Sequence, residues 1–313
     1  MLGKTAGGLF WMFRYLERTE NTARLLDAGL RIAVTKPDNA AGAWKSIIRT
    51  ADSVDLYLNK NSEFDSLGVT EFLLRDANNG SSVLASIDAA RRNARMVRTA
   101  LTREVWEATN EAWMTLHDLL AQPISPSDLP DALNIIRKQS ALVRGALHGT
   151  MLRNDIFDFA QIGFYLERAD NTARILDIKY FIILPEEQKV GSTYDALQWE
   201  TVLRSVSGQR AYRMLHTKGV SAARVASFVM LDRRLPRSLA FCTSQIASHL
   251  ERLAEEYGVE SEALEQARVH RDALRETDIN AIISEGLHEV LQNFIQANDR
   301  LSDLIGTNFR FYA

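Results

Sequence analysis

Two stretches of the chain are almost the same: Tyr15 to Asp27 reads YLERTENTARLLD, and Tyr165 to Asp177 reads YLERADNTARILD. Ten of the thirteen positions are identical, which chance does not plausibly produce. In both stretches apolar residues recur every three or four positions, the period of an α-helix. We therefore expect two matching helices, one in each of two diverged copies of a single unit.

A second match downstream supports this interpretation. Three residues recur with unchanged spacing, namely Trp44, Arg49 and Tyr57 as Trp199, Arg204 and Tyr212. The offset grows from 150 to 155 residues, so we expect a five-residue length difference in the connector that contains Pro185. A looser match further on aligns Asp88, Arg91, Arg92 and Arg95 with Asp232, Arg233, Arg234 and Arg237. The two tryptophans are interpreted as matching core residues.

The helix period continues along the rest of the chain, and no sustained alternation predicts strands. The six prolines lie between the expected helices or at their first turns. The predicted fold is all-α, a helical bundle of two tandem, diverged units (1–125 and 126–313) packed about a pseudo-twofold axis as one fused double domain. Helices are expected at 8–34, 40–60, 64–76, 81–101, 103–121, 128–151, 154–182, 192–217, 220–231, 235–257, 260–275 and 278–307.

Composition narrows the classes of function. The net charge is −3, whereas a protein that mainly holds nucleic acid normally has a strongly basic face. Cys242 is the only cysteine, which excludes an internal disulfide and a multi-cysteine zinc site and fits a reducing compartment. No stretch reaches the roughly 20 apolar residues that span a bilayer, and no targeting segment is visible. We expect a cytoplasmic protein with neither nucleic acid nor a membrane as a partner.

The polar residues of each repeated stretch share one helix face, at about 100° per residue. They are Glu17, Glu20, Asn21 and Arg24 in the first stretch and Glu167, Asp170, Asn171 and Arg174 in the second. Glu20 with Arg24 and Asp170 with Arg174 are favourable i,i+4 ion pairs. A solvated face with weak pairs is one interpretation. A partly buried network explains the identity of the copies better, because removing one member of a buried pair costs about 3–5 kcal/mol.

Glu17 and Glu167 are the candidate catalytic residues, since across a pseudo-twofold axis they could face each other as a general acid and base. Ferritin-like di-iron bundles also use glutamates on helices, but they need a Glu-x-x-His element on two of them. Arginines rather than histidines follow the acids here, so we expect no metal and no cofactor. His148 could approach the second stretch, although a structural role is favoured. Cys242 lies among apolar residues and is interpreted as core.

An arginine stripe offers a different site. Arg91, Arg95 and Arg98 share one helix face, and guanidinium groups bind phosphate or carboxylate in a bidentate manner. A solvated face, or pairing with the motif carboxylates, is the favoured alternative for these residues.

Four segments in this order resemble the bacterial alpha-E domain family over essentially the whole chain: FWMFRYLERTENTARLLD (10–27), ARRNARMVR (90–98), FYLERADNTARILD (164–177) and LPRSLAFC (235–242). The resemblance implies an all-α fold with no settled biochemical activity. The motif positions that it implies in this chain are Tyr15, Glu17, Arg18, Asn21 and Arg24, then Tyr165, Glu167, Arg168, Asn171 and Arg174, then Arg92, Asn93, Arg95 and Arg237. Family members often have glycine before the arginine at the first motif, where this chain has Phe13, which leaves a close backbone approach there in doubt.

The resemblance also implies partners, because members are typically encoded beside a circularly permuted ATP-grasp ligase and a transglutaminase-like peptidase. The leading hypothesis is a helical accessory subunit of a system for peptide synthesis, tagging or processing, which helps hold a peptide or an acidic small molecule. Two alternatives stay open: an enzyme that uses Glu17 or Glu167 in an arginine-rich pocket, and a homo-oligomeric scaffold.

Overall fold

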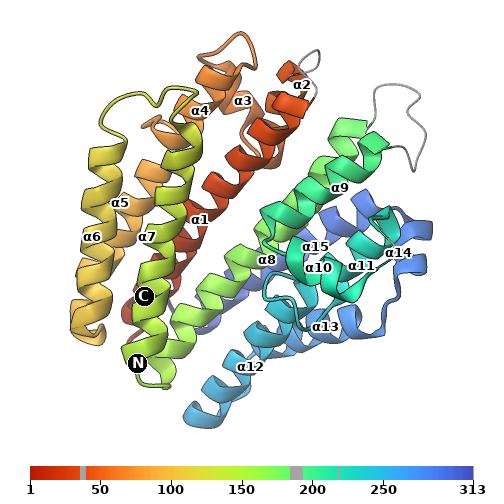
Figure 1. The fold of residues 1–313 in the computed structure, drawn as a ribbon. Coiled ribbons are helices and arrows are strands. Elements are labelled where there is room, and N and C mark those ends of the chain that lie inside the picture. The colour runs from red at the N-terminus through yellow and green to blue at the C-terminus, as the bar shows by residue number, and fades with distance from the viewer. Residues whose placement is uncertain (36–39, 184–192, 218, 313) are drawn as a thin grey trace.

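The computed structural model describes residues 1–35, 40–183, 193–217 and 219–312, and within these ranges it contains helices and no strands (Figure 1). The α-helices are α1 (Gly3–Thr35), α2 (Ala40–Thr50), α3 (Val54–Leu58), α4 (Ser66–Leu74), α5 (Val83–Met96), α6 (Arg103–Leu119), α7 (Leu129–Thr150), α8 (Asp155–Ile183), α9 (Thr193–Ser205), α10 (Gln209–Leu215), α11 (Ala222–Leu231), α12 (Leu239–Tyr257), α13 (Glu262–Glu276), α14 (Ile279–Glu285) and α15 (Leu287–Asn308). A 3₁₀ turn, η2 (Arg98–Ala100), follows α5. The predicted all-α class is confirmed.

The two long helices that carry the repeated stretches, α1 and α8, pack against each other at the centre of the molecule (Figure 1). α5 and α7 pack on α1, and α12 and α15 pack on α8. α2 and α9 each contact both central helices. Each central helix is thus enclosed on most sides, which explains why so many of its residues are buried.

Close packing of α1 on α8 depends on a glycine. A Cβ placed on Gly163 would lie 2.2 Å from the carbonyl oxygen of Phe10, so only glycine allows this backbone approach. At the sequence level a close approach was in doubt beside Phe13. Phe13 is itself buried, and the approach is made by Gly163 of α8, which follows Phe13 at the 150-residue offset.

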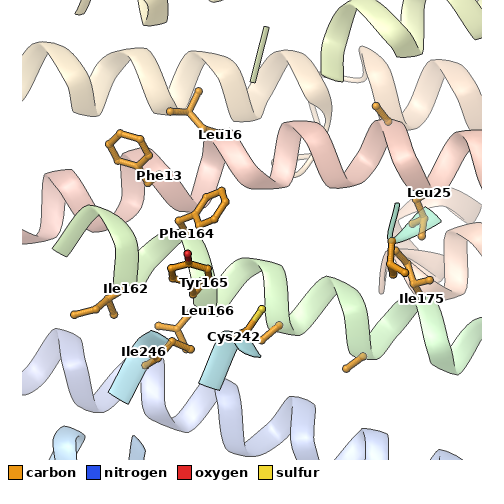
Figure 2. Packing of buried hydrophobic residues seen from close by; sticks show 14 of the residues in the cluster. Phe13, Leu16, Leu25, Ile162, Phe164, Tyr165, Leu166, Ile175, Cys242 and Ile246 are labelled. Atoms are coloured by element: carbon orange, nitrogen blue, oxygen red, sulfur yellow. The ribbon is translucent and has the colours of Figure 1, made fainter. Parts of the chain in front are cut away.

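Apolar side chains fill the layers around the central pair. Figure 2 shows Phe164 of α8 between α8 and α1, and Ile246 and Cys242 of α12 on the other side of α8. Trp44 and Trp199 are both 3 % exposed, and Cys242 is fully buried, so their prediction as core residues is confirmed.

Two of the expected helices are interrupted at matching places. The 40–60 prediction is divided between α2 and α3, and the 192–217 prediction between α9 and α10. The breaks fall at Asp52 (φ 51°) and Ser207 (φ 55°), both in the left-handed region and 155 residues apart. In each turn the next amide closes back on the last helical turn, Ser53 N to Ile48 O at 3.2 Å and Gly208 N to Leu203 O at 2.7 Å. Gly286, with φ 108°, lies between α14 and α15 and divides the last predicted helix.

The turns that precede α5 and α12 also have the same hydrogen bonds, at an offset of 156 residues. The carboxylates of Asp76 and Asp232 accept from the amides two residues later, at 2.8 and 2.9 Å. Ser82 and Ser238 cap the two helices by accepting from amides three residues on, at 3.2 and 3.0 Å. Asp232 and Asp76 therefore have the same place in the two turns, whereas the looser sequence alignment pairs Asp232 with Asp88. At this offset Ser81 matches Arg237.

Among the residues described, no helix is both long and apolar enough to cross a membrane. The same residues contain no cluster of three or more histidine, cysteine or acidic side chains suited to a metal ion. The connector with Pro185, where the five-residue length difference was expected, lies outside the described residues.

Candidate functional site between the central helices

The motif glutamate of each central helix pairs with the motif arginine of the other helix. Arg18 donates to both carboxylate oxygens of Glu167, at 2.5 and 2.9 Å. Arg168 donates to both oxygens of Glu17, at 2.8 and 3.1 Å. Glu17 and Glu167 are 1 % and 5 % exposed. The expectation of an inward-facing network is confirmed, and the alternative of a solvated face is wrong.

Glu167 has a further partner that sequence reasoning missed. Arg14 donates to its Oε2 at 2.8 Å and also to the hydroxyl of Ser302 on α15 at 2.7 Å. Burial alone would raise the pKa of Glu167, but the charges of Arg18 and Arg14 outweigh it and lower this pKa to about 2. Glu167 is therefore a carboxylate throughout the neutral range.

Glu20, with Glu17 and Asn21, belongs to the first half of the site, on α1, and joins it to two other segments, α7 and the turn before α12. Arg24 and Arg237 donate to its Oε1, at 2.7 and 2.6 Å, and Arg144 of α7 donates to its Oε2 at 2.7 Å. Burial would raise the pKa of Glu20, but Arg237, Arg24 and Arg144 hold it well below its usual range. The predicted pair of Glu20 with Arg24 is confirmed.

Arg237 comes from the turn before α12 and lies deep in the network. Besides Glu20 it contacts Glu17 Oε1 at 2.9 Å and donates to the side-chain oxygen of Asn21 at 3.2 Å. Burial, with Arg168 nearby, lowers the pKa of Arg237 to about 10. The group is thus a buried cation at neutral pH, held by two carboxylates and one amide.

The matching positions on α8 are less completely paired. Arg174 donates to Asp170 Oδ2 at 2.8 Å, which confirms the predicted i,i+4 pair, and it lies 3.8 Å from Asp52. The other Asp170 oxygen is buried without a hydrogen-bond partner in the described structure. The side-chain nitrogen of Asn171 is unpartnered in the same sense, and Asn171 is 8 % exposed.

A cavity of about 270 Å³ lies beside these residues. Side chains that line it include Arg18, Ser81, Glu167, Asp170, Asn171 and Arg174. The cavity therefore lies beside the second half of the network, which is formed by Glu167, Asp170 and Asn171 of α8. Ser81, the residue before the α5 cap, also lines it.

The two motif tyrosines, Tyr15 and Tyr165, lie beside the network and take no part in its ion pairs. The guanidinium of Arg18 lies over the ring of Tyr15, 5.5 Å from its centre. Tyr165 is buried, and burial raises its pKa to about 12. The Tyr165 phenol is therefore neither an acid nor a base at neutral pH.

Three residues carried over from the resemblance lie elsewhere. Arg92 and Arg95 on α5 are exposed, and Asn93 donates to Ala89 O of its own helix at 2.8 Å. The structure does not bring them to the network. In the predicted arginine stripe, Arg91 packs over Trp113 at 4.0 Å.

His148 is exposed at the end of α7, where its ring lies 3.4 Å from the Gln161 side chain rather than beside a motif carboxylate.

Arg14 and Arg144 were missed because neither lies within the repeated face. A signal for Arg144 does exist in the sequence. Ser140 and Arg144 are four residues apart on the stripe of α7 that also carries Ile136 and Val143, both fully buried. Polar residues within an apolar stripe indicate a buried polar partner.

Comparison with known proteins is consistent with this site. Residues 1–309 match the Alpha-E family, which is described as "a predicted alpha-helical domain with a conserved ER motif". No curated protein and no solved structure matches the chain. The Glu-Arg dipeptide in that description occurs here in both repeated stretches, as Glu17–Arg18 and Glu167–Arg168. The chain, with its exchanged Glu-Arg pairs at the centre of an all-helical fold, belongs to the Alpha-E family.

Proposed function

We propose that this chain is a non-catalytic binding subunit, built from two diverged copies of one unit around a pseudo-twofold axis. Two reciprocal ion pairs, Arg18 with Glu167 and Arg168 with Glu17, support this arrangement. The matching turns at Asp52 and Ser207 support it as well. Because α7 packs on α1 and α6, we count it with the first unit. The boundary of the proposed units then falls in the turn at 151–154, rather than at 125.

The non-catalytic proposal is based on the arginine partners of the motif glutamates, Glu17 and Glu167, which bind both carboxylates fully. A general acid or base must exchange a proton near neutral pH with a group that reaches it. Glu17 and Glu167 are buried, and each is bound by a bidentate arginine and at least one further guanidinium. The pKa of Glu167, about 2, keeps that group from acting as an acid at neutral pH. In this proposal the network holds α1 and α8 together, and the cavity beside Asp170 is the place where a ligand binds.

We infer the partner from the family. Alpha-E proteins are expected beside a circularly permuted ATP-grasp ligase and a transglutaminase-like peptidase, which implies peptide chemistry in the cytoplasm. The proposed role is an accessory subunit that docks with the ligase and helps hold its peptide substrate.

The test combines the purified chain with a purified circularly permuted ATP-grasp ligase. We expect the two proteins to co-elute in size-exclusion chromatography, and ADP release by the ligase to change when the chain is added. Separate elution together with unchanged turnover would overturn the accessory role.

A second comparison separates binding from catalysis. The Glu17→Gln/Glu167→Gln variant should lose stability and ligase binding together, while Glu107→Gln, which alters an exposed pair with Arg103, should behave as the wild type. A double variant that keeps its fold and ligase binding, but loses an activity that the isolated wild-type chain has, would establish the enzymatic alternative instead.

A further inference from the structure

One arginine is present in the first half of the network and has no counterpart in the second. Arg237 contacts Glu17, Glu20 and Asn21. The residues of α8 that match these three, at the 150-residue offset, are Glu167, Asp170 and Asn171. The residue that matches Arg237 in the turn before α5 is Ser81, whose side chain is too short to reach them as an arginine does.

The consequence is visible in the atoms that Arg237 would satisfy. Arg237 donates to the carboxylate of Glu20 at 2.6 Å and to the amide oxygen of Asn21 at 3.2 Å. In the second half, the buried Oδ1 of Asp170, an acceptor, has no hydrogen-bond partner within the described structure. Ser81, Glu167, Asp170 and Asn171 all line the 270 Å³ cavity. The cavity therefore lies where a guanidinium lies in the other half.

Charge favours a cation in this cavity. Two acids of the first half, Glu17 and Glu20, are contacted by four arginines, whereas Glu167 and Asp170 are contacted by three. A further carboxyl group, Asp299, lies near the second half, where burial and the charge of Asp170 raise its pKa. The second half is thus poorer in positive charge and richer in acid.

The arginines that line the cavity do not exclude a cationic guest. Arg18 is bidentate to Glu167, and Arg174 is bound to Asp170. The matching residues of the first half, Arg168 and Arg24, flank Arg237 in the same way. A guanidinium between two paired arginines is therefore an arrangement that this molecule already contains.

We propose that the cavity beside Ser81 binds a guanidinium group from another molecule, which donates to the unpartnered Oδ1 of Asp170 and takes the place that Arg237 has in the first half. The volume of about 270 Å³ is just below the roughly 300 Å³ at which ligand pockets begin, so it fits one side chain rather than a nucleotide. The guest is then an arginine side chain of a peptide or a free alkylguanidine. The proposal rests on the proposed binding role and names its ligand class.

The experiment is calorimetric titration of the full chain with three probes at low ionic strength. Agmatine represents a free alkylguanidine, a capped Gly-Arg-Gly peptide represents a peptide arginine, and capped Gly-Gln-Gly is the neutral control. We expect saturable binding of at least one guanidinium probe and none of the control. Tighter binding of the peptide than of agmatine assigns the site to peptides, and the reverse order assigns it to small molecules. No saturable binding of either guanidinium probe would overturn the proposal.

Variants locate the binding. Ser81→Arg supplies the missing side chain from within, so it should raise the thermal midpoint and weaken probe binding at least about tenfold. Ser127→Arg adds the same charge on an exposed loop and should bind as the wild type. Should Ser81→Arg fail to fold, isosteric Asp170→Asn gives the same decision, with at least about tenfold weaker binding expected. Unchanged affinity in the folded cavity variant would overturn the site. No ligase is present in this experiment, so its failure is distinct from failure of the accessory role.

Discussion

Replacing Glu167 by glutamine removes one buried charge from the network while keeping the shape of the side chain. Arg14 and Arg18 then lie beside a neutral amide in a site where the wild-type residue is 5 % exposed. The folded protein holds the pKa of Glu167 near 2 instead of its ordinary 4.5, and each pH unit is worth about 1.4 kcal/mol. The loss expected at pH 7 is therefore about 3 kcal/mol, in line with the cost of breaking a buried ion pair.

The stability difference between the wild type and Glu167→Gln should become smaller as the pH falls. Because the folded-state pKa is lowered, the stabilisation by Glu167 is complete above pH 4.5 and is lost as the pH falls from there towards 2. The difference between wild type and Glu167→Gln should shrink to about 1 kcal/mol at pH 3, where the wild-type carboxylate has lost most of its advantage.

Urea unfolding of both proteins at pH 7, 5, 4 and 3 measures this difference directly. Glu107→Gln is the matched control, because its pair with Arg103 is exposed and its removal should cause no measurable change. A variant as stable as the wild type at pH 7, or a difference that stays constant down to pH 3, would refute the reasoning.

Three further predictions concern the packing around the network. Gly163→Ala places a Cβ 2.2 Å from the Phe10 carbonyl oxygen, so α1 and α8 must separate, and the thermal midpoint should fall by an amount corresponding to at least about 1–3 kcal/mol; an unchanged midpoint would contradict the close crossing. Ser82→Ala and Ser238→Ala each remove a helix cap and should each lower the free energy of unfolding by about 1 kcal/mol in urea titrations, whereas a loss at only one of them would show that the two turns are not equivalent. Cys242 is fully buried and burial raises its pKa to about 12, so a thiol reagent should label it only after unfolding; rapid labelling of the native protein would contradict its place in the core.

The sequence predicted the helices well and their interruptions poorly. Periodic apolar residues located α1 and α8 to within a few residues, and the identity of the two stretches pointed to an inward-facing network. The break after α2 was missed because Asp52 adopts a left-handed backbone conformation with no glycine or proline beside it. At the break after α9, Gly208 follows Ser207 and was a signal that the helix period outweighed.

The partners within the network were harder to predict than its members. An i,i+4 pair such as Glu20 with Arg24 follows from helix geometry, which the sequence contains. The exchange of Arg18 and Arg168 between helices depends on how α1 and α8 cross, which one helix face does not reveal. Arg144 lies on α7, remote in sequence from the Glu20 that it contacts.

Charged pairs between α1 and α8 join the two central helices, and a double-mutant cycle on Glu17 and Arg168 measures one such pair. Unfolding free energies are needed for the wild type, Glu17→Gln, Arg168→Gln and the double variant. Since Arg168 donates to both Glu17 oxygens, at 2.8 and 3.1 Å, we expect a coupling free energy of at least about 1 kcal/mol. Strictly additive losses, with no coupling between these two residues, would contradict the account.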